Sequence, residues 1–289
     1  MDRPKMAAID VDGTLVEPGD RVPPENEAAI RRALSAGVHV VISTGRPYER
    51  IRRIIRHLDL TDPVVTLGGA LVMSASGEVY DARPIPPAGV RQIYTFCAAR
   101  GLSVRAHVHG STYAYFRNGN HPDIAANERI SEEMPVHMDV LGDGLGMPVE
   151  GVYKVTIMFE DAALAERLHP EIESEFASLH HAHSASTWLE FTARGASKLR
   201  GVRYVARMLG VSRRDVMAIG DNENDLEMIR WAGMGIYVDS APAALKAFAR
   251  LAPPPGVSAV AWGLTQLVAG AIPVPSAGRA AGARLARPL

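Results

Sequence analysis

The stretch Ala8-Ile9-Asp10-Val11-Asp12-Gly13-Thr14-Leu15 decides the fold, because an apolar run that begins at Met6 ends here in two carboxylates. Such a run predicts a buried strand whose carboxyl end carries the acids. Open α/β sheets bind their ligands at the carboxyl ends of their strands. Two carboxylates this close repel each other, and Mg²⁺ relieves that repulsion by taking carboxylate, water and phosphate oxygens as ligands. The stretch therefore indicates phosphate chemistry assisted by a metal ion.

The composition is that of a globular protein with one large domain or two modest ones, at 289 residues, 47% hydrophobic and 22% charged. A net charge of -1 provides no overall field for nucleic acid or an anionic membrane, and we expect neither as a partner. The single Cys97 excludes an internal disulfide. We expect a cytoplasmic protein, since the N-terminus leads directly into a strand and no apolar run approaches the ~20 residues of a membrane span. The choice between monomer and homodimer stays open.

Further apolar runs also stop in polar or glycine-containing turns, at residues 38–43, 64–67, 216–219 and 234–238. Helical patterns lie between several of these runs, at residues 25–36, 48–58, 198–209 and 226–232. An alternation of strand, crossover helix and strand is typical of a parallel sheet with helices on both faces. We therefore predict an α/β fold with a Rossmann-like parallel sheet.

The middle of the chain has a different pattern. Strand-like stretches and helical stretches alternate there, at 102–109, 112–116 and 152–159 and at 88–100 and 162–176 respectively. We predict an inserted α+β domain over residues 86–184, within a core domain formed by residues 1–85 and 185–271. Residues 118–148 are expected to form loops with one short helix. The Pro-, Ala-, Gly- and Arg-rich residues 272–289 are predicted to be a disordered tail.

Motifs at strand ends and at a helix start follow one another along the chain: Asp10-x-Asp12-Gly13-Thr14, Thr44-Gly45-Arg46, Lys198 and Gly220-Asp221-Asn222-x-Asn224-Asp225. With these residues in this order, the chain resembles the haloacid dehalogenase (HAD) superfamily of phosphohydrolases. The insertion between the second and third motifs makes it similar to the Cof-type branch, whose members carry a C2 cap domain. The resemblance covers nearly everything except the tail. It implies a Mg²⁺-dependent phosphatase, a phosphoric monoester hydrolase, for a small-molecule phosphorylated substrate such as a sugar phosphate or a phosphorylated cofactor.

The acids of these motifs suit hydrolysis through an aspartyl phosphate, which divides one difficult displacement into two easier ones. Asp10, at the strand end, is the better candidate for the nucleophile. Asp12, displaced by the Gly13 turn, could protonate the leaving alkoxide and later deprotonate the attacking water. Asp221 would supply a second carboxylate to Mg²⁺ beside Asp10. The resemblance implies that the backbone carbonyl of Asp12 also faces the metal.

Phosphoryl transfer needs hydrogen-bond donors around the equatorial oxygens of the phosphate. The Thr44 hydroxyl and the backbone amides of Val11 and Gly45 match that need. Lys198 is the expected positive charge beside the pentavalent phosphorus, and its position at a helix start adds the field of the helix N-terminus. Arg46 is predicted either to contact the substrate or to pair with a surface acid.

The last motif and two departures from the family pattern complete the prediction. The resemblance assigns Asn224 to a phosphate or substrate contact, and Asp225 to holding Lys198 or a metal-bound water. Cof-type chains usually have Asn-Gly-Ala where this chain has Gly68-Gly69-Ala70, and Met-Gly-Asn-Ala where it has 238–241, Val-Asp-Ser-Ala. Neither departure touches the phosphoryl-transfer residues, but both leave the substrate open.

Other interpretations remain alongside the phosphatase. A sugar phosphomutase would return the phosphoryl group to a sugar before water attacks, and a non-catalytic phosphometabolite-binding protein would keep the pocket without turnover. Dehalogenation is disfavoured, because it has no use for a leaving-group acid at Asp12 or for Mg²⁺. The histidines at 180, 181 and 183 are interpreted as an exposed junction rather than a metal site. Trp188 and Glu190 are expected on a strand that re-enters the core, in a structural role.

Overall fold

The computed structural model describes residues 5–115, 136–139, 146–249 and 251–270. A parallel sheet with strand order β13-β12-β1-β2 forms its centre. Its members are β1 (Lys5–Ile9), β2 (Val38–Ile42), β12 (Val216–Gly220) and β13 (Met234–Tyr237). Nearly every residue of these strands is buried, because helices cover both faces of the sheet. The α/β fold and these strands are as the sequence predicts.

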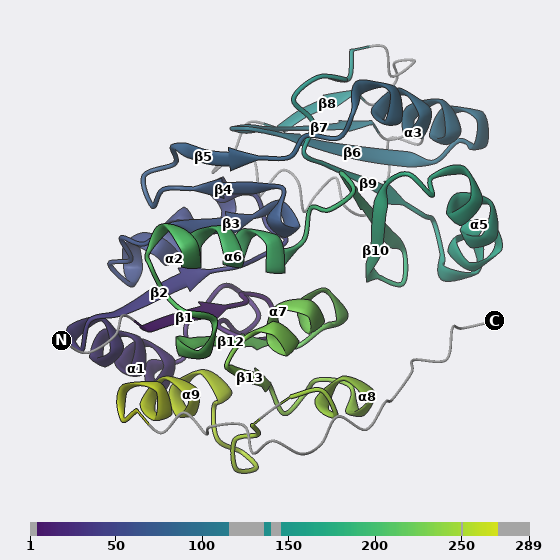
Figure 1. The fold of residues 1–289 in the computed structure, drawn as a ribbon. Helices are drawn as coiled ribbons and strands as arrows, with labels where there is room; N and C mark the ends of the chain where they lie inside the picture. Colours follow the sequence, from purple (N-terminus) through teal and green to yellow (C-terminus); the bar gives the residue numbers. More distant parts are fainter. Residues whose placement is uncertain (1–4, 116–135, 140–145, 250, 271–289) are drawn as a thin grey trace.

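The covering helices pack in pairs on the two faces of the parallel sheet (Figure 1). On one face α1 (Pro24–Ser35) lies against α9 (Ala259–Val268). On the other face α6 (Lys198–Met208) lies against α7 (Leu226–Trp231). Helix α2 (Arg52–His57) lies beside α1, and His57 at its end is 3.0 Å from Glu27 of α1. A short helix, α8 (Ala243–Lys246), follows β13. None of the helices in the described ranges is at once long and apolar enough to span a bilayer.

One predicted member of the parallel sheet belongs elsewhere. Residues 64–67 begin a separate antiparallel sheet made of β3 (Val64–Thr66), β4 (Leu71–Met73) and β5 (Val79–Ala82). The chain reverses at the turn Leu67–Gly69, so that β4 pairs back along β3. An isolated parallel bridge between Ser43 and Val65 still joins β3 to the end of β2.

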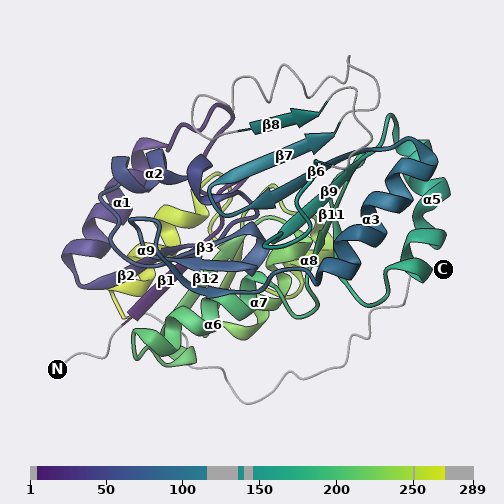
Figure 2. The ribbon, with the colours of Figure 1, turned by 90° about the horizontal axis from the view of Figure 1, so that it is seen from above.

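A six-stranded sheet lies above the parallel sheet and has the strand order β10-β11-β9-β6-β7-β8 (Figures 1 and 2). Its strands are β6 (Ser103–Val108), β7 (Ser111–Tyr115), β8 (Val136–Asp139), β9 (Lys154–Met158), β10 (His180–Ala185) and β11 (Trp188–Thr192). Helices α3 (Pro87–Arg100) and α5 (Ala162–Glu175) pack on one face through a hydrophobic cluster separate from that of the parallel sheet. This separation supports our proposal that the six-stranded sheet and its helices form a cap domain.

The structure corrects two features of the predicted insertion. β11 pairs with β9 and β10, so Trp188 and Glu190 lie on a cap strand and not on one that re-enters the core. The stretch 180–186 is accordingly an edge of the cap sheet, which continues to Thr192, past the boundary predicted at residue 185. Cross-strand pairing outweighs the polar composition from which that boundary was predicted.

The predicted loops at 118–148 fall mostly outside the described residues. The part that is described includes β8, which pairs with β7 in parallel, so the loop prediction is wrong there. The tail predicted at 272–289 also lies outside the described residues.

Candidate active site

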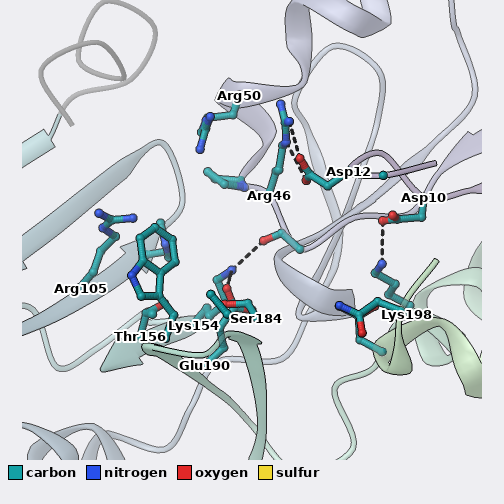
Figure 3. A pocket seen from close by; sticks show the side chains of 18 of the residues that line it. Asp10, Asp12, Arg46, Arg50, Arg105, Lys154, Thr156, Ser184, Glu190 and Lys198 are labelled. Carbon is teal, nitrogen blue, oxygen red and sulfur yellow. Dashed lines mark hydrogen bonds and ion pairs between the residues drawn. The ribbon is translucent and has the colours of Figure 1, made fainter. Parts of the chain in front are cut away.

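A cavity of about 510 Å³ lies between the carboxyl edge of the parallel sheet and the six-stranded sheet. The core contributes lining residues from the ends of β1, β2 and β12, and the cap contributes residues from β6, β7, β9, β10 and β11 (Figure 3). The predicted site residues that line it are Asp10, Asp12, Gly45, Arg46, Lys198, Asp221 and Asn224. The topology therefore brings motifs from distant parts of the chain to one pocket.

Lys198 is the centre of the core side of this cavity. Its Nζ atom donates to Asp10 Oδ1 and to Asp225 Oδ1, both at 2.7 Å. Ile9 and Ile219 are paired on the adjacent parallel strands β1 and β12, so the acids that follow these strands meet at one edge. All three charged side chains are almost completely buried. The pairing of Asp225 with Lys198 is one of the two roles that the sequence left open.

Asp225 is held from the other side by backbone amides. Its Oδ2 accepts hydrogen bonds from the backbone N–H groups of Asp221 and Asn222, each at 3.2 Å. Gly220 makes room for this arrangement, because a Cβ atom there would lie 2.3 Å from Cγ of Asp225. Both oxygens of Asp225 are therefore engaged in orienting Lys198 and the turn after β12.

Asp10, Asp221 and Asp225 form a cluster in which one oxygen of each lies within 4.8 Å of the others. Among the described residues, this is the one such group of three or more acidic, histidine or cysteine side chains, so the histidines at 180, 181 and 183 form none. Close carboxylate oxygens are the ligands that Mg²⁺ takes. Gly13, at a φ of 72°, permits the approach, since a Cβ there would lie 2.4 Å from Asp221 Oδ2.

The electrostatics of the cluster favour a cation. Burial raises the pKa of Asp10 to about 7 against the lowering effect of Lys198, and the charges of Asp225 and Asp221 add to the rise. Burial and the charge of Asp225 also raise the pKa of Asp221. The pKa of Lys198 is raised: burial opposes its charge, but Asp10 and Asp225 outweigh that effect. A divalent cation between Asp10 and Asp221 would offset the repulsion that remains.

The Asp12 carboxylate points away from this cluster and is 63% exposed. Arg46 donates to it through Nε at 2.9 Å and through Nη2 at 2.5 Å, and Nη2 also lies 2.7 Å from Asp20. Although burial acts to raise the pKa of Asp12, the hydrogen bonds and charge of Arg46 hold it below its usual value. Of the two roles predicted for Arg46, pairing with acids is the one seen here. The role of the Asp12 carbonyl at a metal stays a prediction.

The predicted phosphate-binding residues divide into two groups. Gly45 and Asn224 line the cavity, as an anion contact requires. Thr44 is completely buried and is not among the lining residues. Its Oγ1 accepts a hydrogen bond from the backbone N–H of Arg46 at 3.1 Å, so this hydroxyl shapes the turn after β2.

The cap supplies lining residues that the sequence analysis did not identify. Lys154 on β9 is buried, and its Nζ donates to the Gly45 carbonyl and to Glu190 Oε1, both at 2.8 Å. The cap is thereby tied to the turn that follows β2. Glu190, expected to be structural, holds this lysine and also lines the cavity. The alternation of polar and apolar residues along β9 and β11 carries the signal, but it does not tell which face is turned to the cavity.

Comparisons with known proteins place this geometry in context. The family model of haloacid dehalogenase-like hydrolases matches residues 7–253. The 5-amino-6-(5-phospho-D-ribitylamino)uracil phosphatase YitU of Bacillus subtilis (strain 168) is 27% identical over 252 residues, covering 86% of this chain and 91% of that protein. Phosphatase YwpJ of the same organism is 24% identical over 264 residues, covering 85% and 93%.

Solved structures share the fold of this chain. A haloacid dehalogenase-like hydrolase from Bacteroides thetaiotaomicron superposes with a TM-score of 0.78 over 92% of this chain and 100% of that chain, at 22% identity. The sugar phosphatase BT4131, of HAD subclass IIB, superposes with a TM-score of 0.73 over 90% and 99%, also at 22% identity. At these identities the likeness shows the fold alone.

Proposed function

Because the chain belongs to the haloacid dehalogenase-like hydrolase family, we propose that it is a Mg²⁺-dependent phosphatase that hydrolyses a small-molecule phosphomonoester through an aspartyl phosphate. One observation carries the proposal: buried Asp10 lies at a strand end, 2.7 Å from the Lys198 ammonium and beside Asp221, in a cavity. The relatives named as phosphatases support the reaction class. A sugar phosphate or a phosphorylated cofactor is the proposed substrate.

Asp10 acts as the nucleophile in this proposal. One of its carboxylate oxygens forms a bond to phosphorus while the bond from phosphorus to the leaving oxygen breaks. Water then attacks the phosphorus, the aspartyl oxygen leaves with its electron pair, and the carboxylate and inorganic phosphate are restored. Lys198 keeps Asp10 oriented and places a positive charge where negative charge accumulates on the transferring group.

The carboxylates of Asp10 and Asp221 and the backbone carbonyl of Asp12 are the groups that would hold Mg²⁺. Asp225 is already engaged through both oxygens, so it positions Lys198 and the turn that carries Asp221. When bound, Mg²⁺ neutralises charge on the carboxylates and the phosphate, which would otherwise repel each other.

Asp12 is the proposed acid and base. In the structure Arg46 holds its carboxylate away from Asp10. A phosphate entering beside Gly45 would compete for the Arg46 guanidinium and release Asp12 to turn toward the leaving oxygen. Asp12 would then give a proton to that oxygen and later take one from the attacking water.

The partners and location follow from the same features. A cavity of about 510 Å³ under a cap suits a small molecule, which we propose as the substrate in place of a protein. A net charge of -1 supports our proposal that nucleic acid is not a partner. We also propose a cytoplasmic location, supported by the single cysteine.

The experiment is a phosphate-release assay with Mg²⁺ over several dozen phosphorylated metabolites, comparing the wild type with Asp10→Asn. We expect turnover of at least one phosphomonoester by the wild type and a loss of roughly 10⁴-fold or more in the variant. Asp239→Asn, which alters an exposed aspartate, is the matched control and should keep wild-type turnover. Equal turnover by Asp10→Asn and the wild type would disprove the nucleophile assignment.

A further inference from the structure

The cap face that lines the cavity is polar and buried at the same time. Arg105 and His107 on β6, Thr112 on β7, and Lys154 and Thr156 on β9 are each less than a tenth exposed, and all of them line the cavity. The apolar side chains of the same sheet pack against α3 and α5. Burying polar groups costs free energy, so a polar face maintained over a cavity indicates a polar ligand.

Two arginines reach this cavity from different halves of the molecule. Arg105 lies in the middle of cap strand β6, and Arg50 ends the short helix Tyr48–Arg50 of the core. Both line the cavity, and Figure 3 shows Arg105 on the cap side and Arg50 on the core side. The guanidinium carbon of Arg105 lies 5.2 Å from the ring centroid of Trp188, within the range of a cation–π contact. A ligand between them would meet planar donor groups from both sides.

The charges around His107 show the sign of the potential at this end. Burial lowers the pKa of His107 well below its usual value, and the charges of Lys154, Arg105 and Arg50 lower it further. The ring is therefore neutral, and its Nδ1 lies 2.8 Å from Thr112 Oγ1. At the core end, by contrast, carboxylates surround the cations. Arg105, Arg50 and Lys154 thus bring three cations to this end against the carboxylate of Glu190, on the side where the leaving group of a bound phosphate ester would lie.

We propose that the cap end of the cavity is an anion subsite, in which Arg105 and Arg50 bind a carboxylate or second phosphate on the leaving group of the substrate. Guanidinium groups match the geometry of both anions through paired hydrogen bonds. Thr156 and the His107–Thr112 pair would face hydroxyl groups between the two ends of the substrate. This inference rests on the proposed function, because it defines the leaving group of that reaction.

Matched substrate pairs test the subsite. Sorbitol 6-phosphate and 6-phosphogluconate differ only in a terminal hydroxymethyl or carboxylate, and glycerol 3-phosphate and 3-phosphoglycerate form a shorter pair. Sorbitol 1,6-bisphosphate supplies the second-phosphate arm. We expect the wild type to show a kcat/KM at least about ten-fold higher for a carboxylate or bisphosphate than for its neutral partner. The arm with the larger ratio identifies which anion the subsite prefers.

Variants of the two arginines test whether the preference for anionic substrates comes from the subsite. Arg105→Gln and Arg50→Gln should each reduce that ratio toward one, mainly through KM, and Arg105→Lys should restore part of it. Arg32→Gln, an exposed arginine of α1, is the matched control and should leave the ratio unchanged. Equal kcat/KM within every pair, or an equal fall for charged and neutral substrates in Arg105→Gln, would overturn the subsite. Para-nitrophenyl phosphate separates the two proposals: its hydrolysis with no anion preference overturns the subsite alone, whereas no hydrolysis of any substrate overturns the phosphatase as well.

Discussion

Two buried lysines face the same cavity, Lys198 from the core and Lys154 from the cap, and their surroundings differ. Lys198 lies between two carboxylates that are themselves buried, with side-chain exposures of 5% for Asp10 and 0% for Asp225. Lys154 lies between one carboxylate, Glu190, which is 23% exposed, and the backbone carbonyl of Gly45. Lysine is rarely buried unless it is paired. Lys198 and its two carboxylate partners together carry a net negative charge. Lys154 and Glu190 together are neutral, and they link the cap to the core.

This difference indicates that the core end and the cap end of the cavity have different roles. Three carboxylates and one ammonium at the core end form a site that a divalent cation and an anionic phosphate together would stabilise. At the cap end, Lys154 and Glu190 compensate each other and hold the turn at Gly45 without adding net charge. We therefore propose that the reaction chemistry depends on the core lysine, and that closure of the cavity depends on the cap lysine.

The largest effect is expected for Lys198→Met. Removing this ammonium leaves Asp10 and Asp225 buried without their counter-charge, which should lower the free energy of unfolding by about 3–5 kcal/mol. Turnover should fall by about 10²–10³-fold or more, because a charge that stabilises the transition state is lost. Urea unfolding and phosphate release measure the two effects. Lys246→Met, at an exposed lysine, is the control, and a Lys198→Met protein as stable as this control would break the comparison.

The second-largest effect is expected for Mg²⁺ binding, which should depend on the core end of the cavity and not on the cap end. A ligand at 100 times its Kd stabilises the folded state by about 2.7 kcal/mol. Calorimetry should therefore show Tm rising with Mg²⁺ concentration in the wild type and in Lys154→Met, and little rise in Asp221→Asn. Asp239→Asn should behave as the wild type. An unchanged Mg²⁺ response in Asp221→Asn would remove Asp221 from the metal site.

The sequence identified the core end because each of its residues follows a local signal. Asp10 and Asp221 come directly after apolar strands, and Lys198 opens a helix after the capping residue Ser197. Parallel strands bring such ends together whatever the details of packing. The direction of the Asp12 side chain has no such signal, because it depends on a tertiary contact with Arg46.

The cap end depends on pairings that only the folded chain reveals. Lys154 and Glu190 belong to β9 and β11, two strands that are far apart in sequence. In the register of these strands Lys154 is opposite Thr192, so it pairs diagonally with Glu190. Period-two alternation defines two faces for each strand, but the packing of α3 and α5 decides which face turns to the cavity. The extent of the cap sheet was misjudged for the same reason, since β11 is recognised by its partners and not by its composition.

Lys154→Met should have an intermediate effect and thereby sharpen the contrast with Lys198. The Gly45 carbonyl loses its donor, while Glu190 is exposed enough to reach water. We expect a loss of about 2 kcal/mol in the free energy of unfolding, below that of Lys198→Met. In steady-state kinetics KM should rise more than kcat falls, because the cap closes less tightly. A fall in kcat alone would instead place Lys154 in the chemical step.

The smallest effect concerns pH and the neutral His107. This ring faces Lys154 on β9, Arg105 on β6, Arg50 of the core and Thr112 on β7, and burial with these cations keeps its folded-state pKa well below 6.5. Below pH 6.5 the unfolded chain takes up a proton at this position and the folded chain does not, so stability falls as pH falls. Between pH 6.5 and 5.5 the loss should be about 1 kcal/mol. His107→Gln should remove this part of the pH dependence in urea unfolding, while His109→Gln, outside the cavity lining, should retain it. Identical pH profiles for the wild type and His107→Gln would show that folding does not lower the pKa of this ring, and that the cap end is less positive than its arginines indicate.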